Sequence, residues 1–386
     1  MGKGKRFRRK GLFLTLKQEM LMSKVKIGFL GAGGIAKAHA FSLNSLRYFY
    51  PKTPQVVFES VCSQRLESRG QFAESYGFRQ AQSFDDFVQN EAIDTVLILG
   101  PNKVHADHLK AVATMPNVRR IYLEKPVCSS LQEEKELAAL PLDGRKVQLG
   151  FQYLQTASVR EAIDFWKSGK LGKPIHFDLK YFHGDYLQKS YRDKRQTRLT
   201  PAPDGGAMAD LGSHGISLLL AFFGEQLEIT SALQGGQFAD VPKDSDLFSL
   251  ISIVELKTRA VGNLSASRIS SGTGDLVHLE IYAEKGTLRY SSHRAESFEY
   301  FLEETQQWVS QPVGSHYKPI SSFPSGHVPP GWLRSMIHGH YLFLGGRDEK
   351  AFVPDLKHGL EVQRLVRETA EHLNTYRKQL EKYGEK

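Results

Sequence analysis

The sequence has few of the features that mark secreted, membrane or metal-binding proteins. Only two of its 386 residues are cysteine, Cys62 and Cys128, and neither has CxxC or metal-ligand spacing. Both lie in apolar stretches, which predicts buried, unreactive thiols in a reducing compartment such as the cytoplasm. No apolar run approaches the roughly 18 residues of a membrane span, and we find no internal repeats. The sequence therefore favours a globular cytoplasmic protein, with no bound metal and no membrane partner.

The positive charge is concentrated at one end of the chain. The formal net charge is +9, but residues 1–22 hold seven lysines and arginines against one glutamate, which leaves +3 for the rest. That remainder shows no basic stripe for nucleic acid. The basic segment lacks the apolar core and cleavage site of a signal peptide. We interpret residues 1–22 as a disordered extension, with a tail for nucleic acid or a membrane surface as the alternative.

The most informative stretch is Lys26-Ile-Gly-Phe-Leu-Gly-Ala-Gly-Gly-Ile-Ala36. An apolar run ends in a glycine cluster and continues as a helical pattern, which predicts a strand, a tight turn and a helix. Gly31 permits the turn, and Gly33 lets a diphosphate approach the N–H groups at the helix N-terminus. Gly34 and Ile35 complete the predicted dinucleotide cradle. The alternative is an ordinary strand–turn–helix connection, which this context makes less favoured.

The end of the next predicted strand, residues 56–62, bears on the choice of coenzyme. In a dinucleotide-binding fold this end meets the adenosine ribose, where a carboxylate would repel a 2′-phosphate. Here the position holds Ser63, followed by Gln64 and Arg65. A hydroxyl and a guanidinium suit a phosphate, so NADP(H) stays open beside NAD(H). Arg65 as a solvated residue of the next helix is the equally weighted alternative.

Two later strands are predicted to end on the same side of a parallel sheet, where such sheets bind ligands. Residues 94–100 lead into Pro101 and Asn102, and Asn102 is placed to bond a ribose or to cap a helix. His105, one turn later, is better explained as structural. Residues 120–123 lead into Glu124 and Lys125. A lysine beside a carboxylate can have a tuned pKa and transfer protons, although alone it would pass for a surface lysine.

These motifs together resemble the glucose–fructose oxidoreductase / inositol dehydrogenase / MocA (Gfo/Idh/MocA) family. Four motifs follow one another in the family's order: strand–GAGGIA–helix, Leu-Gly-Pro-Asn-Lys-Val-His105, Glu-Lys-Pro-Val127 and Gly206-Ala-Met-Ala-Asp210-Leu-Gly-Ser-His214. The resemblance implies a mixed α/β and α+β fold. It implies an N-terminal Rossmann domain over residues 23–150 and a C-terminal domain over 151–386 with a large, mostly antiparallel sheet. It also implies NAD(H) or NADP(H) and a sugar or polyol substrate.

The resemblance assigns roles to individual residues. The catalytic set carried over is Lys125, Asp210 and His214. Coenzyme contacts are expected from the glycine turn, Ser63 and Arg65, and from Pro101, Asn102, His105, Glu124 and Lys125. Substrate contacts are expected from Lys125, Asp210 and His214, and from Gln152, Tyr186, Gln188 and His327. Two positions depart from the family: Leu154 replaces an arginine, and Lys189-Ser-Tyr191 replaces an Asp-Trp pair, so the identity of the substrate stays open.

The second half of the sequence supports this interpretation. Asp210 and His214 are four residues apart in a predicted helix that continues to Phe223, which would place both side chains on one face. Carboxylate, imidazole and lysine would then form a proton chain for a secondary alcohol. A buried, satisfied histidine is the alternative. The sequence predicts a long basic loop over the crevice at residues 183–204. Its residues Lys189, Arg192 and Arg195 would contact hydroxyls or an anionic group of a substrate, or they would remain solvated.

The remaining pattern predicts an antiparallel sheet and two closing helices. The strands are expected at residues 250–254, 262–269, 277–283 and 287–291, and the helices at 332–343 and 356–373. The open face of this sheet is, by the resemblance, an interface for a homodimer or homotetramer. The leading functional hypothesis is reversible hydride transfer between a nicotinamide and a sugar or polyol. Glycoside cleavage with retained NAD, and a non-catalytic regulator that binds dinucleotide and sugar, are the alternatives.

Overall fold

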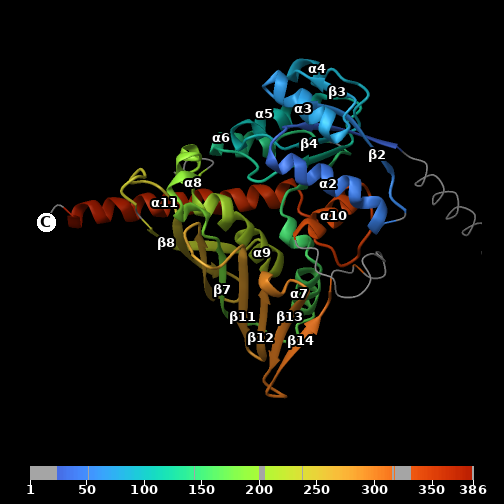
Figure 1. Ribbon diagram of the computed structural model, residues 1–386. Coiled ribbons are helices and arrows are strands. Elements are labelled where there is room, and N and C mark those ends of the chain that lie inside the picture. Colours follow the sequence, from blue (N-terminus) through green and yellow to red (C-terminus); the bar gives the residue numbers. More distant parts are fainter. Residues whose placement is uncertain are drawn as a thin grey trace, which may run out of the picture.

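The computed structural model describes residues 24–384 except 51, 143, 200–204, 237, 315–316 and 318–331 (Figure 1). The basic extension at residues 1–22 and His327 therefore lie outside the described residues. Figure 1 shows a helix-covered sheet in the upper part of the molecule and a broad second sheet below it. None of the described helices is both long enough and apolar enough to cross a membrane.

The first sheet is fully parallel, with strand order β3-β2-β1-β4-β5-β6. Its strands are β1 (Lys24–Leu30), β2 (Gln55–Cys62), β3 (Gln80–Gln82), β4 (Thr95–Ile98), β5 (Arg120–Leu123) and β6 (Lys146–Leu149). The connecting helices are α2 (Gly34–Phe49), α3 (Leu66–Tyr76), α4 (Phe84–Val88), α5 (His105–Thr114) and α6 (Leu131–Ala138). This is the doubly wound Rossmann order, in which the carboxyl ends of β1 and β4 flank the ligand crevice. The sequence-based prediction of the Rossmann fold is confirmed.

The second sheet has eight strands in the order β14-β13-β12-β11-β7-β10-β9-β8. They are β7 (Pro174–Phe182), β8 (Leu227–Gly235), β9 (Phe248–Glu255), β10 (Ala260–Ser267), β11 (Leu276–Ala283), β12 (Gly286–Ser291), β13 (Ser297–Leu302) and β14 (Gln307–Pro312). The pair β7/β10 is parallel and the other pairs are antiparallel. The sheet is thus mostly antiparallel. The exception arises because β7, the first strand of this sheet in the sequence, lies between β10 and β11 and runs parallel to β10.

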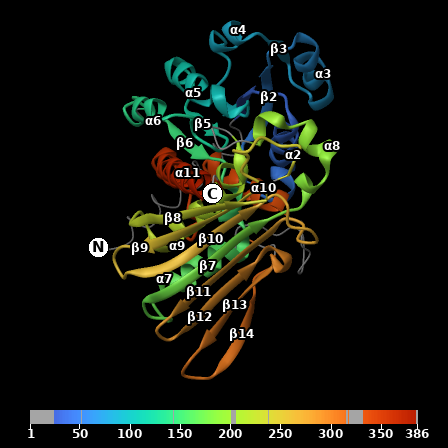
Figure 2. The same ribbon diagram turned by 90° about the vertical axis from the view of Figure 1, so that its left-hand side faces the viewer.

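One face of the second sheet is covered and the other is open. Helices α7 (Ala157–Lys167) and α9 (Ser213–Phe223) pack on one face, and the buried positions of β9 and β11 alternate accordingly. Figure 2 looks onto the broad outer face. Such alternation arises because successive side chains of a strand point to opposite faces. The apolar positions therefore build the core against the helices.

The closing helices are α10 (Trp332–Phe343) and α11 (Leu356–Gly384). Helix α10 packs on α2 of the Rossmann domain, although it comes from the other end of the chain. Helix α11 lies along α9 and β8, and its last turns project from the body (Figure 1). It extends beyond the predicted end at Leu373, because the pattern of apolar residues stops there while the backbone continues as a helix on the surface.

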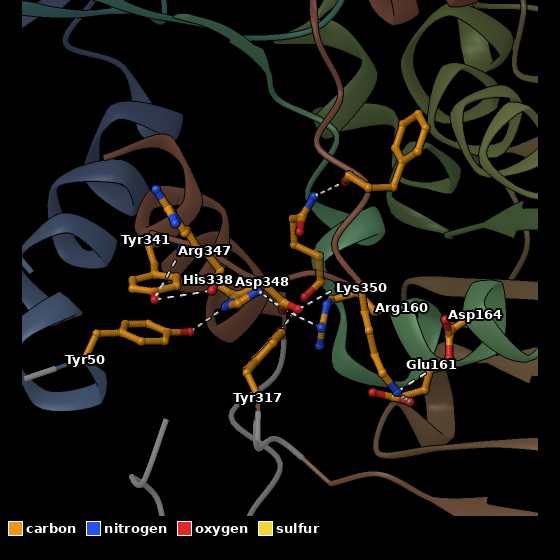
Figure 3. Close-up of polar contacts among 12 residues, drawn as sticks. Tyr50, Arg160, Glu161, Asp164, Tyr317, His338, Tyr341, Arg347, Asp348 and Lys350 are labelled. Carbon is orange, nitrogen blue, oxygen red and sulfur yellow. Dashed lines mark hydrogen bonds and ion pairs between the residues drawn. The ribbon is translucent and has the colours of Figure 1, made fainter. Parts of the chain in front are cut away.

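A buried polar network fixes α10 between the two domains (Figure 3). The Tyr50 hydroxyl, at the end of α2, lies 2.7 Å from Nδ1 of His338, whose Nε2 lies 3.0 Å from the Asp348 carboxylate. Asp348 also pairs with Arg160 of α7, and Arg334 donates to the Tyr50 hydroxyl at 2.9 Å. Because the carboxylate, imidazole, phenol and guanidinium satisfy one another, the domain junction can be polar and still be buried.

The shortest elements are one-turn helices in the connections. They are η1 (Asn102–Val104), η2 (Gln152–Gln155), η3 (Asp185–Leu187), α8 (Lys189–Asp193), η4 (Gln196–Arg198), the π-helical turn η5 (Met208–Gly212) and η6 (Ser292–Arg294). The region predicted as one long loop from residue 183 thus contains three short helices, η3, α8 and η4. The prediction of a loop was wrong for these three segments.

Candidate active site

The glycine turn after β1 has the geometry of a diphosphate cradle. Gly31 has φ +128°, and a Cβ there would lie 2.6 Å from the carbonyl carbon of Leu99, so only glycine fits. Gly33 and Gly34 would place a Cβ in open space. Gly33 is the N-cap of α2 and makes no side-chain hydrogen bond to the helix. The first turn, which begins with Gly34 and Ile35, carries no acidic residue. The helix dipole therefore favours an anion at this N-terminus. The residues present therefore fit a dinucleotide.

Basic groups surround the end of β2, where an adenosine ribose would lie. The Ser63 hydroxyl donates to the carbonyl of Arg65 at 3.3 Å, and Arg65 itself is exposed. The guanidinium of Arg69 donates to the Ser63 carbonyl at 3.1 Å. Sequence reasoning missed Arg69, which lies in α3, four residues after Arg65 at the helix N-cap. Two guanidinium groups therefore flank this strand end, and Ser63 stands at the position where an acidic residue would disfavour NADP.

The connection after β4 is held by a buried histidine. Pro101 precedes η1 and Asn102 begins it. His105 is fully buried, with Nδ1 2.7 Å from the Pro126 carbonyl and Nε2 2.9 Å from the Gly100 carbonyl. The ring therefore ties the loops after β4 and β5 together. This geometry fits the structural role favoured for His105 from sequence.

The peptide bond before Pro126 is cis, and the two residues before it face different partners. The Glu124 carboxylate is buried, 2.9 Å from Nε2 of His39, and accepts a bond from the Lys125 backbone N–H at 3.2 Å. The Lys125 ammonium instead donates to Asp210, at 2.7 Å to Oδ1 and 2.8 Å to the main-chain oxygen. The carboxylate that the ammonium contacts thus comes from the other domain, not from the neighbouring glutamate.

Asp210 lies at the centre of a cluster of three cations. Arg268 donates to Oδ2 at 2.7 Å, and Arg198 lies 3.5 Å from Oδ1. Burial alone would raise the pKa of Asp210, but the charges of Lys125, Arg268 and Arg198 outweigh it and hold the pKa well below its usual range. Asp210 is therefore a permanent anion that orients the ammonium of Lys125.

The helix that carries Asp210 and His214 is not regular. Its first turn, η5, is a π-turn, and α9 starts only at Ser213. The Asp210 carbonyl accepts bonds from Lys125 Nζ and from the Ser213 hydroxyl at 3.2 Å, and such insertions into the helix ladder favour a bulge. The prediction of regular α-helical spacing was wrong here, since it could not include a partner from the Rossmann domain.

The start of this turn is fixed by a second buried carboxylate. Asp246 accepts the Met208 N–H at 2.9 Å and bonds Ser249. Gly206 has φ +88°, and a Cβ there would lie 2.5 Å from Asp246 Oδ2. Burial raises the pKa of Asp246 above its usual value. Asp246 therefore positions the backbone from which Asp210 projects.

His214 faces an aromatic pocket beside this charge cluster. Its ring packs edge-on against Phe151 and Tyr153 and lies 5.9 Å from the ring of Tyr181. The Tyr153 and Tyr181 hydroxyls are 2.9 Å apart. Burial, with the charge of Lys125, lowers the pKa of His214 well below its usual value, so the ring is neutral. Its Nδ1 has no hydrogen-bond partner among the described residues.

The substrate-facing residues inferred by resemblance divide into separate groups. Tyr186 is buried, and the Arg268 guanidinium carbon lies 4.6 Å from the centroid of its ring. Tyr186 therefore adjoins the Asp210 cluster. Gln188 is exposed at the start of α8, and Gln152 is half-buried in η2. His327 lies outside the described residues.

The basic residues expected over the crevice have partners of their own. Arg192 is buried and forms a two-pronged pair with Asp240, so it fits neither of the two alternatives left open from sequence, a substrate contact or a solvated charge. Lys189 pairs with Asp193, and Arg195 stacks on Tyr191. A guanidinium that bonds both oxygens of a carboxylate is no longer available to a ligand.

The site also contains residues that sequence reasoning missed: Arg268, Arg198, Tyr153 and Tyr181. Arg268 is fully buried and directly follows β10. A lone arginine after a strand of small and apolar residues is a signal that could have found it, because an unpaired buried charge is rarely tolerated. Among the described residues, no group of three or more His, Cys, Asp or Glu side chains is arranged to hold a metal.

The fold and the site define a class of protein: a two-domain oxidoreductase with a Rossmann domain for a nicotinamide dinucleotide. The description "Oxidoreductase family, NAD-binding Rossmann fold" matches residues 25–151, and "GFO/IDH/MocA C-terminal domain" matches residues 157–289. The chain belongs to the Gfo/Idh/MocA family of oxidoreductases. The resemblance stated from the motifs is confirmed.

Individual relatives are distant. The chain is 23% identical to the levoglucosan dehydrogenase of Pseudarthrobacter phenanthrenivorans over 72% of its own length and 76% of that protein. It is 24% identical to the glucose-6-phosphate 3-dehydrogenase of Bacillus subtilis, over 69% of this chain and 74% of that one. The structure of levoglucosan dehydrogenase with NADH and levoglucosan superposes with a TM-score of 0.79 at 19% identity, covering 92% of this chain and 98% of that one. That likeness shows a shared fold.

Proposed function

We propose that this oxidoreductase interconverts a secondary alcohol and a ketone of a sugar, sugar derivative or polyol. The observation that carries the proposal is the arrangement of Lys125, Asp210 and His214. An ammonium has three donors, and two of those of Lys125 are used by Asp210. The third is available to a substrate oxygen, next to the neutral imidazole of His214.

The roles of these residues follow from their charges. In the reducing direction Lys125 donates a proton to the substrate carbonyl oxygen, and in the oxidising direction it takes the hydroxyl proton. Asp210 keeps the lysine nitrogen in place, and Arg268 and Arg198 keep Asp210 ionised. His214 bonds the same or a neighbouring hydroxyl through its neutral ring. The glycine turn at Gly31, Gly33 and Gly34 would hold a nicotinamide coenzyme, which would supply or accept the hydride.

Relatives support the class of substrate. Proteins similar to this chain include levoglucosan dehydrogenase, glucose-6-phosphate 3-dehydrogenase and scyllo-inositol 2-dehydrogenase. We propose a cyclic sugar or inositol-like substrate on this basis. We also propose that NADP(H) is accepted as well as NAD(H), because Ser63 rather than a carboxylate directly follows β2, and Arg65 and Arg69 lie close after it. A similar protein is a D-xylose 1-dehydrogenase that uses NADP(+).

The experiment that tests this function is a substrate panel. Purified protein is mixed with anhydrosugars, hexoses, sugar phosphates and inositols, each with NAD⁺ or NADP⁺, and formation of the reduced coenzyme is followed by its absorbance. Turnover of a cyclic polyol with one coenzyme is expected. Absence of turnover with every compound, together with absence of coenzyme binding, would contradict the proposal. The absorbance of the protein as purified tests for retained coenzyme.

We further propose a cytoplasmic homodimer or homotetramer that associates through the outer face of the second sheet. Val261 is 55% exposed and Trp308 is 48% exposed, although both lie in strands. Arg289 stacks on Trp308, and His176 stacks on Tyr282, so large flat side chains lie on this sheet. Both cysteines are free and buried, which suits a reducing compartment.

A further inference from the structure

Helix α10 reaches the active site through a chain of hydrogen bonds that the mechanism above does not use. His340 of α10 has its Nε2 2.8 Å from Nδ1 of His39 in α2. Nε2 of His39 is 2.9 Å from Oε1 of Glu124, and the other carboxylate oxygen accepts the backbone N–H of Lys125 at 3.2 Å. The chain therefore runs from the C-terminal part of the sequence to the residue that carries the reactive ammonium.

The protons in this chain can be placed. Burial, with the neighbouring His39, lowers the pKa of His340 well below its usual value, so its ring is neutral and carries one proton. Nδ1 of His340 is buried and has no partner among the described residues. A buried N–H without an acceptor is costly, so the proton lies on Nε2 and is donated to Nδ1 of His39. Since that nitrogen accepts, His39 carries its proton on Nε2 and donates it to Glu124.

The surroundings leave the Glu124 carboxylate little freedom to move. A Cβ at Gly150 would lie 2.6 Å from Oε1 of Glu124, so the end of β6 closes one side. Tyr122 packs edge-on against His39 at 5.0 Å and lies 5.2 Å from the ring of His340. The titratable groups around the carboxylate are thus His39 from α2, His340 from α10, and Tyr122 and Lys125 from the β5 region. Burial, with the charge of Glu124, raises the pKa of Tyr122 well above its usual value, so its phenol stays neutral.

We propose that His39 and His340 are positioning residues that hold the Glu124 carboxylate, and through it the Lys125 backbone, in the reactive arrangement. Lys125 is then fixed at both ends, by Glu124 at its N–H and by Asp210 at its ammonium. A general acid that is misplaced by a fraction of an ångström loses much of its effect. The kinetic consequence of this inference rests on the proposed function, but the proton positions do not.

The kinetic test compares variants of the two histidines with a control on the same helix. His39→Leu removes the donor to Glu124, His39→Gln restores an amide N–H at a similar reach, and His340→Phe removes the donor to His39. His338→Phe is the control, because His338 is equally buried in α10 but bonds Tyr50 and Asp348 (Figure 3). His39→Leu and His340→Phe are expected to lower kcat about tenfold, with coenzyme affinity changed less than about twofold.

Rescue by the conservative variant separates positioning from a merely structural role. His39→Gln should restore most of kcat, because its amide N–H can again bond the Glu124 carboxylate. His338→Phe should lose stability yet keep kcat. A kcat in His39→Leu that matches that of His338→Phe would overturn the proposal.

A second measurement needs no substrate. In protein labelled with [¹⁵N]histidine, the ring nitrogens of His39 and His340 report their tautomers and are assigned by their loss in His39→Gln and His340→Phe. Both rings are expected to carry the proton on Nε2. A proton on Nδ1 of either ring would overturn the chain even if the enzyme is active. If no sugar is turned over, the proposed function fails while this result still decides the inference.

Discussion

The ammonium of Lys125 and the carboxylate of Asp210 are 2.7 Å apart, although 85 residues separate them in the chain. One comes from the connection after β5 of the Rossmann domain and the other from the π-turn before α9. The contact therefore joins the coenzyme domain to the second domain at the point where a substrate would lie. Arg268 and Arg198 also pair with Asp210, and together with Lys125 they hold the pKa of its carboxyl well below its usual range.

Replacing Lys125 tests its role as general acid and base. We expect Lys125→Ala to lower turnover at least ~10²-fold, the usual contribution of such a group, while coenzyme affinity stays near that of the wild type. The measurement is kcat together with coenzyme titration. Lys110→Ala is the control, since Lys110 pairs with Asp107 and Glu136 on the surface of the same domain. Unchanged turnover in Lys125→Ala would refute the assignment.

Removing Arg268, which is fully buried, leaves the half-buried Asp210 carboxylate short of a partner. We expect Arg268→Met to lower the free energy of unfolding by about 3–5 kcal/mol at neutral pH, as for other broken buried pairs. Urea unfolding measures this, with Arg289→Met on the outer face of the sheet as the control. A loss as small as that of the control would show that the pair with Arg268 contributes little.

The pH dependence of that loss has a definite sign. The folded pKa of Asp210 lies below its unfolded value of about 3.9. Its pairs therefore stabilise the fold at pH values above the unfolded pKa, and the stabilisation is lost as pH falls through the folded pKa. The deficit of Arg268→Met should stay constant from pH 8 to 6 and shrink below about pH 4. A deficit that grows on acidification would contradict the assignment.

Buried histidines should make the protein sensitive to mild acid. Burial lowers the pKa of His338 to about 3 and those of His108 and His358 to about 4, and it also lowers the pKa values of His214 and His340 well below the usual value. Below about pH 6.5 the unfolded chain binds protons that the folded state excludes. The free energy of unfolding therefore decreases as the pH is lowered. We expect the urea midpoint to decrease steadily between pH 6.5 and 4.

One variant isolates a single histidine of this set. His358→Asn removes one group that titrates only on unfolding, so the slope of stability against pH should become shallower by up to about 1.4 kcal/mol per pH unit between pH 6 and 5. Nε2 of His358 lies 2.8 Å from the Ser217 hydroxyl. A midpoint independent of pH in the wild type would show that these rings are already protonated in the folded state.

The coenzyme preference is tested at the end of β2. We expect Ser63→Asp to weaken binding of NADP(H) at least about tenfold while binding of NAD(H) is kept or improved, because a carboxylate repels a 2′-phosphate and bonds a 2′-hydroxyl. Arg65→Ala should weaken only NADP(H). Fluorescence titration with each reduced coenzyme measures both. Equal effects of Ser63→Asp on the two coenzymes would place the ribose elsewhere.

The outer face of the second sheet is tested by a charge. We expect Val261→Glu to lower the molar mass in solution from that of a dimer or tetramer, because an unpaired carboxylate is costly within an interface. Light scattering after gel filtration measures the mass. Leu66→Glu is the control, since Leu66 is 70% exposed on α3 of the other domain. A wild-type mass in Val261→Glu would exclude this part of the face as the interface.

The sequence alone determined the features that depend on local pattern. The glycine turn, the apolar parallel strands and the cap of α3 at Gly77, with φ +75°, follow from residues within a few positions of one another. The order of the motifs, through the family resemblance, was enough to predict that Lys125, Asp210 and His214 share one site. Periodicity and turn chemistry act over a few residues and can be read without the fold.

The tertiary structure decided which of these residues contact one another. It paired Lys125 with Asp210 rather than with Glu124, wound the turn at Asp210 as a π-turn, and bound Arg192 to Asp240 rather than leaving it for a substrate. It also brought Arg268 to Asp210 and His340 to His39. Charges and hydrogen bonds act over a few ångströms in space, whatever the distance along the chain, so only the packed fold fixes their partners.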